Sequence, residues 1–157
     1  MKVQLSDVLK AKKFLEDYIQ PSPLLFNARL SEQFGAEIYL KLENMQPIGA
    51  FKLRGATYKI SRLTEEEKKR GVIAASAGNH AQGVAWGSKK LGVDAMIVMP
   101  ETATLIKVQN TKRLGAKVHL EGHTYDEAYQ AALRIAQETG RVYVHAYEDA
   151  DIIAGQG

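Results

Sequence analysis

The feature that most constrains the fold is a regular alternation of short apolar runs and helix patterns after residue 64. The apolar runs lie at 72–75, 95–99, 117–120 and 142–145, and helix patterns fill 79–91, 104–114 and 124–140. Glycine or proline ends most of these segments. Short apolar strands that alternate with helices pair in parallel and are covered by helices. We therefore predict an α/β fold with a parallel sheet and helices on both faces.

Two Thr–Glu pairs mark helix starts within this region. Thr64 precedes Glu67, and Thr124 precedes Glu127, with the spacing of a capping box. In that motif the threonine side chain accepts from the backbone N–H three residues on, and the glutamate returns to the threonine N–H. The pairs predict a short helix that ends at Gly71 and a longer helix that ends near residue 140.

The first 63 residues predict a less regular arrangement. Ser6 is the expected cap of the first helix, Pro21 follows that helix, and Gly35 is the expected end of the second. Apolar and polar residues alternate from residue 38 to 42, which is typical of a half-buried strand. The predicted elements are helices at 6–19, 30–34 and 51–63 and a strand at 38–42.

Composition excludes several classes of protein. Cysteine is absent, which rules out disulfides and thiolate metal sites. No apolar stretch approaches the roughly 18 residues of a membrane span, and no basic cluster marks a nucleic-acid surface. His119 and His123 are separated by Gly122 and a predicted strand end, so we predict no metal site there. A cytoplasmic protein without nucleic-acid or membrane partners is the expectation.

One segment with chemical potential is Ser76-Ala77-Gly78-Asn79-His80-Ala81-Gln82-Gly83, where a predicted strand turns into a helix. Small residues let a ligand approach the backbone, and N–H groups at a helix start favour an anion such as a carboxylate or phosphate. An ordinary strand-to-helix turn, capped by Ser76 or Asn79, is the alternative that spacing alone favours.

A second segment places Lys52 at the start of a predicted helix among Gly, Ala and Phe residues. Burial lowers a lysine pKa because the charged form loses its water. A partly neutral lysine can attack a carbonyl group or act as a base. Lys52 as an ordinary surface lysine is the alternative that composition alone favours.

Taken together, these segments resemble the fold-type II pyridoxal-phosphate enzymes, closest to the threonine/serine dehydratases (threonine ammonia-lyases), with serine racemase nearby. The stretches that carry the resemblance occur in the family's order and cover nearly the whole chain. They are SPLLFNARLSEQFGAEIYLKLENMQPIGAFKLRGA, SAGNHAQGVA, the proline of VMPE, LGAKVHLEG and DIIAGQG.

The resemblance implies a role for each matching residue. It places the lysine that binds pyridoxal 5'-phosphate covalently at Lys52, an aromatic neighbour of the cofactor at Phe51, and the asparagine facing the cofactor's phenolic oxygen at Asn79. It also implies a loop that grips the substrate carboxylate, formed by Ser76, Ala77, Gly78, Asn79 and His80.

The activity that the resemblance implies is deamination of L-threonine or L-serine by β-elimination, with a place in amino-acid metabolism such as isoleucine biosynthesis. Ala77 stands where serine racemase carries its second acid/base serine, so racemisation is the less favoured alternative. Ala146 stands where relatives often carry proline, so we expect the loop after residue 145 to differ. Relatives are commonly dimers or tetramers, which implies a homo-oligomer.

The resemblance also implies a domain division. Residues 1–51 correspond to the first part of a larger domain, 52–150 to a smaller α/β domain, and 151–157 to a return toward the larger one. The family's glycine-rich phosphate loop has no counterpart among these 157 residues. We therefore expect the sequence to be part of a longer enzyme, and we expect this part alone to be a non-catalytic fragment with poor cofactor affinity.

Overall fold

A four-stranded parallel sheet forms the centre of the molecule in the computed structural model, which describes residues 2–157. The strand order is β5-β4-β3-β6, with Ala74 beside Ile97 and Ile97 beside Val118. The strands are β3 (Val72–Ala75), β4 (Ala95–Met99), β5 (Lys117–Leu120) and β6 (Val142–Tyr143). The predicted α/β class and the parallel pairing are confirmed, although β6 ends two residues earlier than expected.

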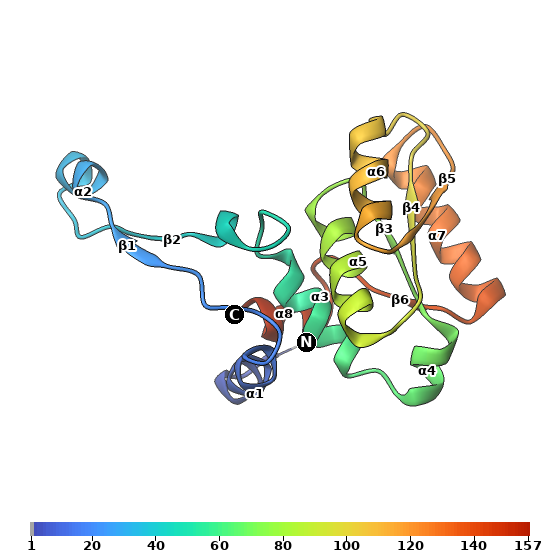
Figure 1. The fold of residues 1–157 in the computed structure, drawn as a ribbon, viewed down its shortest axis with the longest axis horizontal. Helices are drawn as coiled ribbons and strands as arrows, with labels where there is room; N and C mark the ends of the chain where they lie inside the picture. The colour runs from blue at the N-terminus through green and yellow to red at the C-terminus, as the bar shows by residue number, and fades with distance from the viewer. Residues whose placement is uncertain (1) are drawn as a thin grey trace.

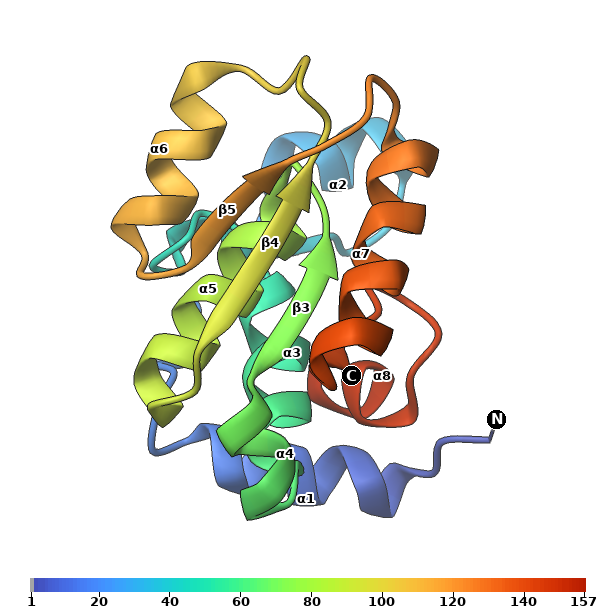
Figure 2. The ribbon, with the colours of Figure 1, turned by 90° about the vertical axis from the view of Figure 1, so that its right-hand side faces the viewer.

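Helices cover both faces of this sheet (Figures 1 and 2). Successive side chains of a strand point to opposite faces. Ile73 and Val98 therefore pack against one helix, whereas Ala74 and Ile97 pack against the others. The first face carries α7 (Tyr125–Thr139); the second carries α3 (Lys52–Ser61), α5 (Asn79–Leu91) and α6 (Leu105–Arg113).

Both predicted capping boxes are present. Thr64 accepts from the N–H of Glu67 ahead of α4 (Glu65–Arg70), and the Glu67 carboxylate returns to the Thr64 N–H at 2.8 Å. Thr124 and Glu127 repeat this arrangement ahead of α7. A stretch of four residues is enough to satisfy these donors, which explains why the motif can be recognised without tertiary information.

The first helix differs from its prediction. α1 (Leu5–Leu15) begins one residue before Ser6, and its capping box is formed by Gln4 and Asp7. The prediction that Ser6 caps this helix is therefore wrong. Gln4 has extended backbone, and Asp7, three residues later, accepts from the Gln4 N–H at 3.1 Å.

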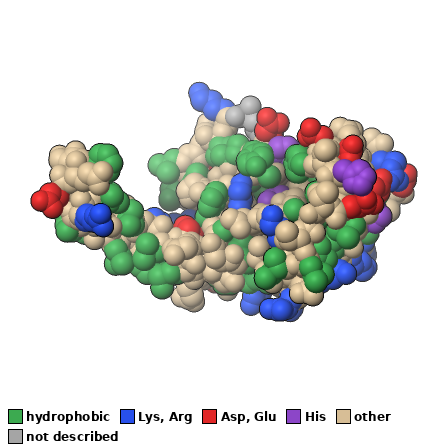
Figure 3. Space-filling model, turned by 90° about the horizontal axis from the view of Figure 1, so that it is seen from above, with side chains coloured by type: hydrophobic (Ala, Val, Ile, Leu, Met, Phe, Trp, Pro, Cys, Tyr) green, Lys and Arg blue, Asp and Glu red, His purple; other side chains and the backbone are tan. Residues whose placement is uncertain are grey.

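An exposed arm replaces the predicted half-buried strand. β2 (Tyr39–Lys41) pairs antiparallel with β1 (Leu24–Phe26), a strand that the sequence did not indicate, and the two carry α2 (Ala28–Phe34). Every residue of both strands is exposed. The arm extends away from the sheet, and apolar side chains lie along it (Figures 1 and 3). The alternation of apolar and polar residues correctly predicted an extended strand. It could not predict whether one face of that strand would be buried against a core.

Three helices meet beneath the sheet at two glycines. α3 crosses α8 (Ala150–Gln156), and α1 packs against both. A Cβ atom on Gly55 would lie 2.7 Å from the Ile152 carbonyl oxygen, and one on Gly155 would lie 2.8 Å from the Gly55 Cα. Only glycine permits α3 and α8 to approach this closely, so α8 packs directly against the helix that starts at Lys52. No helix between residues 2 and 157 is long and apolar enough to cross a membrane.

A largely buried ion pair joins this helix to the base of the arm. Arg54 donates from Nε and Nη2 to the two carboxylate oxygens of Glu43, at 2.8 Å each, in the short 3-10 helix Glu43–Met45. The Arg54 hydrogen bond is the largest cause that lowers the Glu43 pKa to about 2. Ser22 also donates to this carboxylate. The pair therefore fixes the turn that leads into Lys52.

We predict that Arg54→Leu lowers the free energy of unfolding at pH 7 by about 1–3 kcal/mol, because it leaves a charged acceptor without its partner. Since the folded pKa of Glu43 is depressed, the pair stabilises the wild type above pH 4.5, and this contribution is lost as the pH falls toward 2. The difference in unfolding free energy between the wild type and Arg54→Leu should therefore be smaller at acidic pH. Urea denaturation at pH 7 and pH 3 measures both effects.

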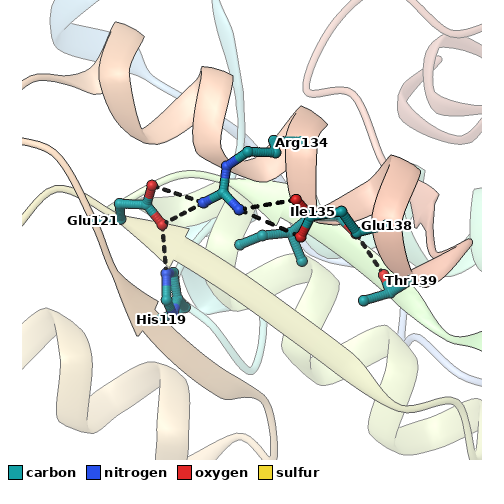
Figure 4. Close-up of polar contacts among 6 residues, drawn as sticks. All are labelled: His119, Glu121, Arg134, Ile135, Glu138 and Thr139. Atoms are coloured by element: carbon teal, nitrogen blue, oxygen red, sulfur yellow. Dashed lines mark hydrogen bonds and ion pairs between the residues drawn. The ribbon is translucent and has the colours of Figure 1, made fainter.

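A matched control is Arg134→Leu, which breaks an ion pair that also involves both carboxylate oxygens but is exposed to solvent. Arg134 donates to both oxygens of Glu121 and contacts Glu138, and His119 lies on the other side of Glu121 (Figure 4). Half of the Arg134 side chain is open to solvent. Solvent screens exposed pairs, so this variant should lower the free energy of unfolding less than Arg54→Leu does. Equal losses would contradict the importance of the Arg54 pair.

Candidate functional site

Lys52 is the first residue of α3, and its side chain reaches a segment almost one hundred residues later. Its Nζ donates to the Ala146 carbonyl oxygen at 3.0 Å. The same atom lies 4.6 Å from the centre of the Tyr147 ring and 5.2 Å from that of Phe51. Burial lowers the Lys52 pKa. The amine is thus only partly hydrated, and it loses its proton more readily than the amine of a surface lysine does.

The loop from Ser76 to His80 follows β3 at the carboxyl edge of the sheet. The Ser76 N–H still donates to Val98, so the loop leaves the sheet immediately after that bond. The Gly78 N–H donates to the Ser76 hydroxyl at 3.1 Å, and α5 begins at Asn79. Gly78 and Asn79 are exposed. The start of this 13-residue helix is therefore exposed to solvent, and the N-terminus of a helix favours an anion.

A close helix crossing brings this loop beside Lys52. A Cβ atom on Gly83 would lie 2.9 Å from the backbone carbon and oxygen of Lys52, and one on Gly87 would lie 2.7 Å from the Thr57 hydroxyl. Asn79 lies one turn before Gly83, on the same side of α5. The structure therefore brings together the two segments that the sequence singled out separately.

The segment after β6 contributes groups that sequence reasoning missed. His145 Nδ1 accepts from the N–H groups of Tyr147 and Glu148 at 3.1 and 2.8 Å, and this turn presents the Ala146 carbonyl to Lys52. One signal was available: the segment follows a strand of the same parallel sheet, and the carboxyl ends of such strands share an edge. Ala146 lies directly at the site, since its carbonyl oxygen accepts from Lys52.

His80 is buried, and its side chain points toward this segment. Its Nε2 lies 2.9 Å from the Val144 carbonyl oxygen, and only 5% of the residue is exposed. Burial lowers the His80 pKa to about 4, against the opposing effect of the Val144 hydrogen bond; the nearby charge of Lys52 lowers it further. The ring is therefore neutral at pH 7 and donates from Nε2.

This pKa predicts an acid-sensitive fold. Because the folded pKa of His80 lies below the unfolded value of 6.5, its contribution is complete above pH 6.5 and is lost as the pH falls toward 4. The loss should amount to roughly 3 kcal/mol at about 1.4 kcal/mol per pKa unit. Urea denaturation between pH 7 and pH 4 measures it. His80→Gln cannot titrate and should show a flatter profile over this window; parallel profiles would contradict the assignment.

The other histidines lie apart from this site. His119 Nε2 contacts Glu121 at 2.8 Å, and His123 Nδ1 lies 3.6 Å from Glu101, both near the surface. Across residues 2–157, no group of three or more His, Asp or Glu side chains is placed to hold a metal ion.

Comparison with known proteins connects this geometry to one family. The sequence profile described as "Pyridoxal-phosphate dependent enzyme" matches residues 15–157. The chain is 53% identical over 155 residues to L-threonine ammonia-lyase of Thermotoga maritima, covering 99% of this chain and 39% of the relative. The chain thus spans about two fifths of that relative's length.

Two solved structures share the fold. Threonine deaminase isoform 2 of Solanum lycopersicum, in its processed form, superposes with a TM-score of 0.91 at 42% identity, over 96% of this chain and 41% of that one. Serine racemase of Dictyostelium discoideum gives a TM-score of 0.91 at 35% identity, over 98% of this chain and 50% of that one.

Proposed function

This chain belongs to the family of pyridoxal-phosphate-dependent enzymes, and we propose that its protein deaminates L-threonine and L-serine by β-elimination to a 2-oxo acid and ammonia. The observation that carries the proposal is the half-buried amine of Lys52, which has a lowered pKa. The backbone of this residue packs against Gly83, one turn after the exposed start of α5. The names of the relatives supply the substrate class.

The residues around Lys52 fit pyridoxal phosphate, a flat pyridine ring with an aldehyde. The aldehyde needs an amine that loses its proton readily, and burial gives Lys52 that property. Phe51 and Tyr147 offer aromatic surfaces close to the amine. We assign Lys52, Phe51 and Asn79 to the cofactor, and we assign no residue of this chain to its phosphate.

Two tasks in the reaction fall to this chain. Bound pyridoxal phosphate withdraws electrons from the substrate's α-carbon. The Lys52 amine would take the α-proton, and the Ala146 carbonyl can accept a hydrogen bond from the protonated amine that results. The loop of residues 76–80, at the positive end of α5, would bind the substrate carboxylate and orient the α-proton toward Lys52. The N–H groups that would do this are those of Ala77, Asn79 and His80, because those of Ser76 and Gly78 already donate within the protein.

Racemisation of serine is the second candidate, since a serine racemase shares the fold. A racemase needs a proton-transfer group on each face of the substrate. Ala77 occupies the loop position that corresponds to the second group and has no exchangeable proton. This residue favours deamination over racemisation.

The assay uses the complete protein, with whatever chain its gene encodes besides these residues. After addition of pyridoxal phosphate, L-threonine and L-serine should each yield ammonia and a 2-oxo acid in equal amounts. Appearance of D-serine without oxo acid would instead favour the racemase. Sedimentation of the same sample tests the proposed homo-oligomer. We also propose a cytoplasmic location and a role in amino-acid metabolism, such as isoleucine biosynthesis; the cysteine-free composition suits a reducing compartment.

A further inference from the structure

The His80 side chain is hydrogen-bonded to the backbone segment that contacts Lys52, the proposed cofactor lysine. A carbonyl oxygen can only accept, so the 2.9 Å contact between Val144 O and Nε2 requires a proton on Nε2. The other ring nitrogen, Nδ1, is buried and has no hydrogen-bond partner among residues 2–157. The side chain therefore has one polar contact there, and that contact is with the segment after β6.

The segment from Val144 to Glu148 is otherwise held at only a few points. The Val144 N–H donates to Ile73 O at 2.8 Å, which is the last bond of the segment to the sheet. Beyond it, His145 closes the turn by accepting from Tyr147 and Glu148. The bond from His80 acts at the junction between sheet and turn, two residues before the carbonyl that binds Lys52.

We propose that His80 is a positioning residue for Lys52, acting through the Val144–Tyr147 segment. Its Nε2–H fixes the Val144 peptide, and this places the Ala146 carbonyl and the Tyr147 ring over the lysine amine. The inference rests on the proposed role of Lys52. The proposed role belongs to the His80 side chain. It is separate from the proposed binding of the substrate carboxylate by backbone N–H groups of the loop that contains His80.

A histidine that only fills space would behave differently. An aromatic ring without a donor, as in His80→Phe, would then preserve the surroundings of Lys52. If His80 positions the segment, that variant leaves the Val144 carbonyl unpaired, and the turn moves away from the amine. Since burial is what lowers the Lys52 pKa, water that reaches the amine should raise it.

The test measures the Lys52 amine without cofactor. Acetic anhydride labels neutral amines, and peptide mass spectrometry reports the labelling midpoint of each lysine as the pH is varied. Lys90 is the internal reference, since it also lies over an aromatic ring, that of Trp86, but is exposed. The Lys52 midpoint should lie below that of Lys90 in the wild type. It should rise toward that of Lys90 in His80→Phe, which lowers the reactive fraction of Lys52 at a given pH.

Two variants complete the design. His80→Gln retains an N–H donor at similar reach and should restore the wild-type midpoint. His123→Gln changes an exposed histidine outside the site and should have no effect. A folded His80→Phe protein with the wild-type Lys52 midpoint would overturn the proposal.

A measurement on the wild type covers the case in which His80→Phe does not fold. Long-range proton–nitrogen NMR of the ring should show the neutral Nε2–H form at pH 7, and an Nδ1–H form would overturn the proposal. Neither experiment uses pyridoxal phosphate or substrate. Absence of 2-oxo acid in the activity assay would therefore refute the deaminase proposal while leaving the result for His80 readable.

Discussion

Replacing Lys52 with alanine should abolish covalent attachment of pyridoxal phosphate, and it should lower ammonia release from L-threonine by at least roughly 10³-fold in the complete protein. The lysine is proposed both to bind the cofactor and to take the α-proton, so one substitution removes two functions. Reduction with borohydride followed by mass spectrometry should locate the cofactor on Lys52 in the wild type. The variant should show no visible absorption from a lysine–cofactor adduct.

Lys90→Ala is the control for this experiment. Lys90 also lies over an aromatic ring, 5.4 Å from the centre of Trp86, but it is exposed near the end of α5. This variant should keep both cofactor attachment and ammonia release. Attachment that persists in Lys52→Ala, or that is lost equally in Lys90→Ala, would refute the assignment of the reactive lysine.

Replacing Gly83 with alanine should lower the free energy of unfolding by about 1–3 kcal/mol, the usual cost of overpacking. The added methyl group would lie 2.9 Å from backbone atoms of Lys52, which cannot rotate away as a flexible side chain can. Alanine is favoured over glycine within a helix by about 1 kcal/mol, so a net loss would show that the contact outweighs this preference. Urea denaturation measures the change.

The same substitution should disturb the site. To accommodate the methyl group, α3 and α5 must separate at the residue that carries the reactive amine. Covalent attachment of pyridoxal phosphate should therefore fall even in molecules that remain folded. Ser88→Ala is the control on the same helix: it removes a buried hydroxyl that has no partner among the described residues, and it should leave stability unchanged or slightly higher. A stable Gly83→Ala protein with normal attachment would contradict the proposed crossing.

Much of the central sheet was predictable because its signals are local. The threonine of each capping box lies three residues from its glutamate, and the four apolar runs became the four parallel strands. The same locality explains the errors. Ser6 has the chemistry of a cap, but the cap depends on where the backbone becomes extended, which is at Gln4. The strand predicted at 38–42 has the right conformation, but its burial depends on distant packing.

Local sequence patterns account for the order of strands and helices in the central sheet, for its parallel class, and for the presence of a lysine and a small-residue loop suited to one chemistry. The contacts of Lys52 with Ala146 and Tyr147, and the hydrogen bond of the His80 side chain with Val144, arise from tertiary packing instead. Local patterns do not encode them because the partners are far apart along the chain: Lys52 and Ala146 are separated by 94 residues. Their contact depends on the register of β3 with β6 and on a crossing that glycine permits, and no local pattern encodes either one.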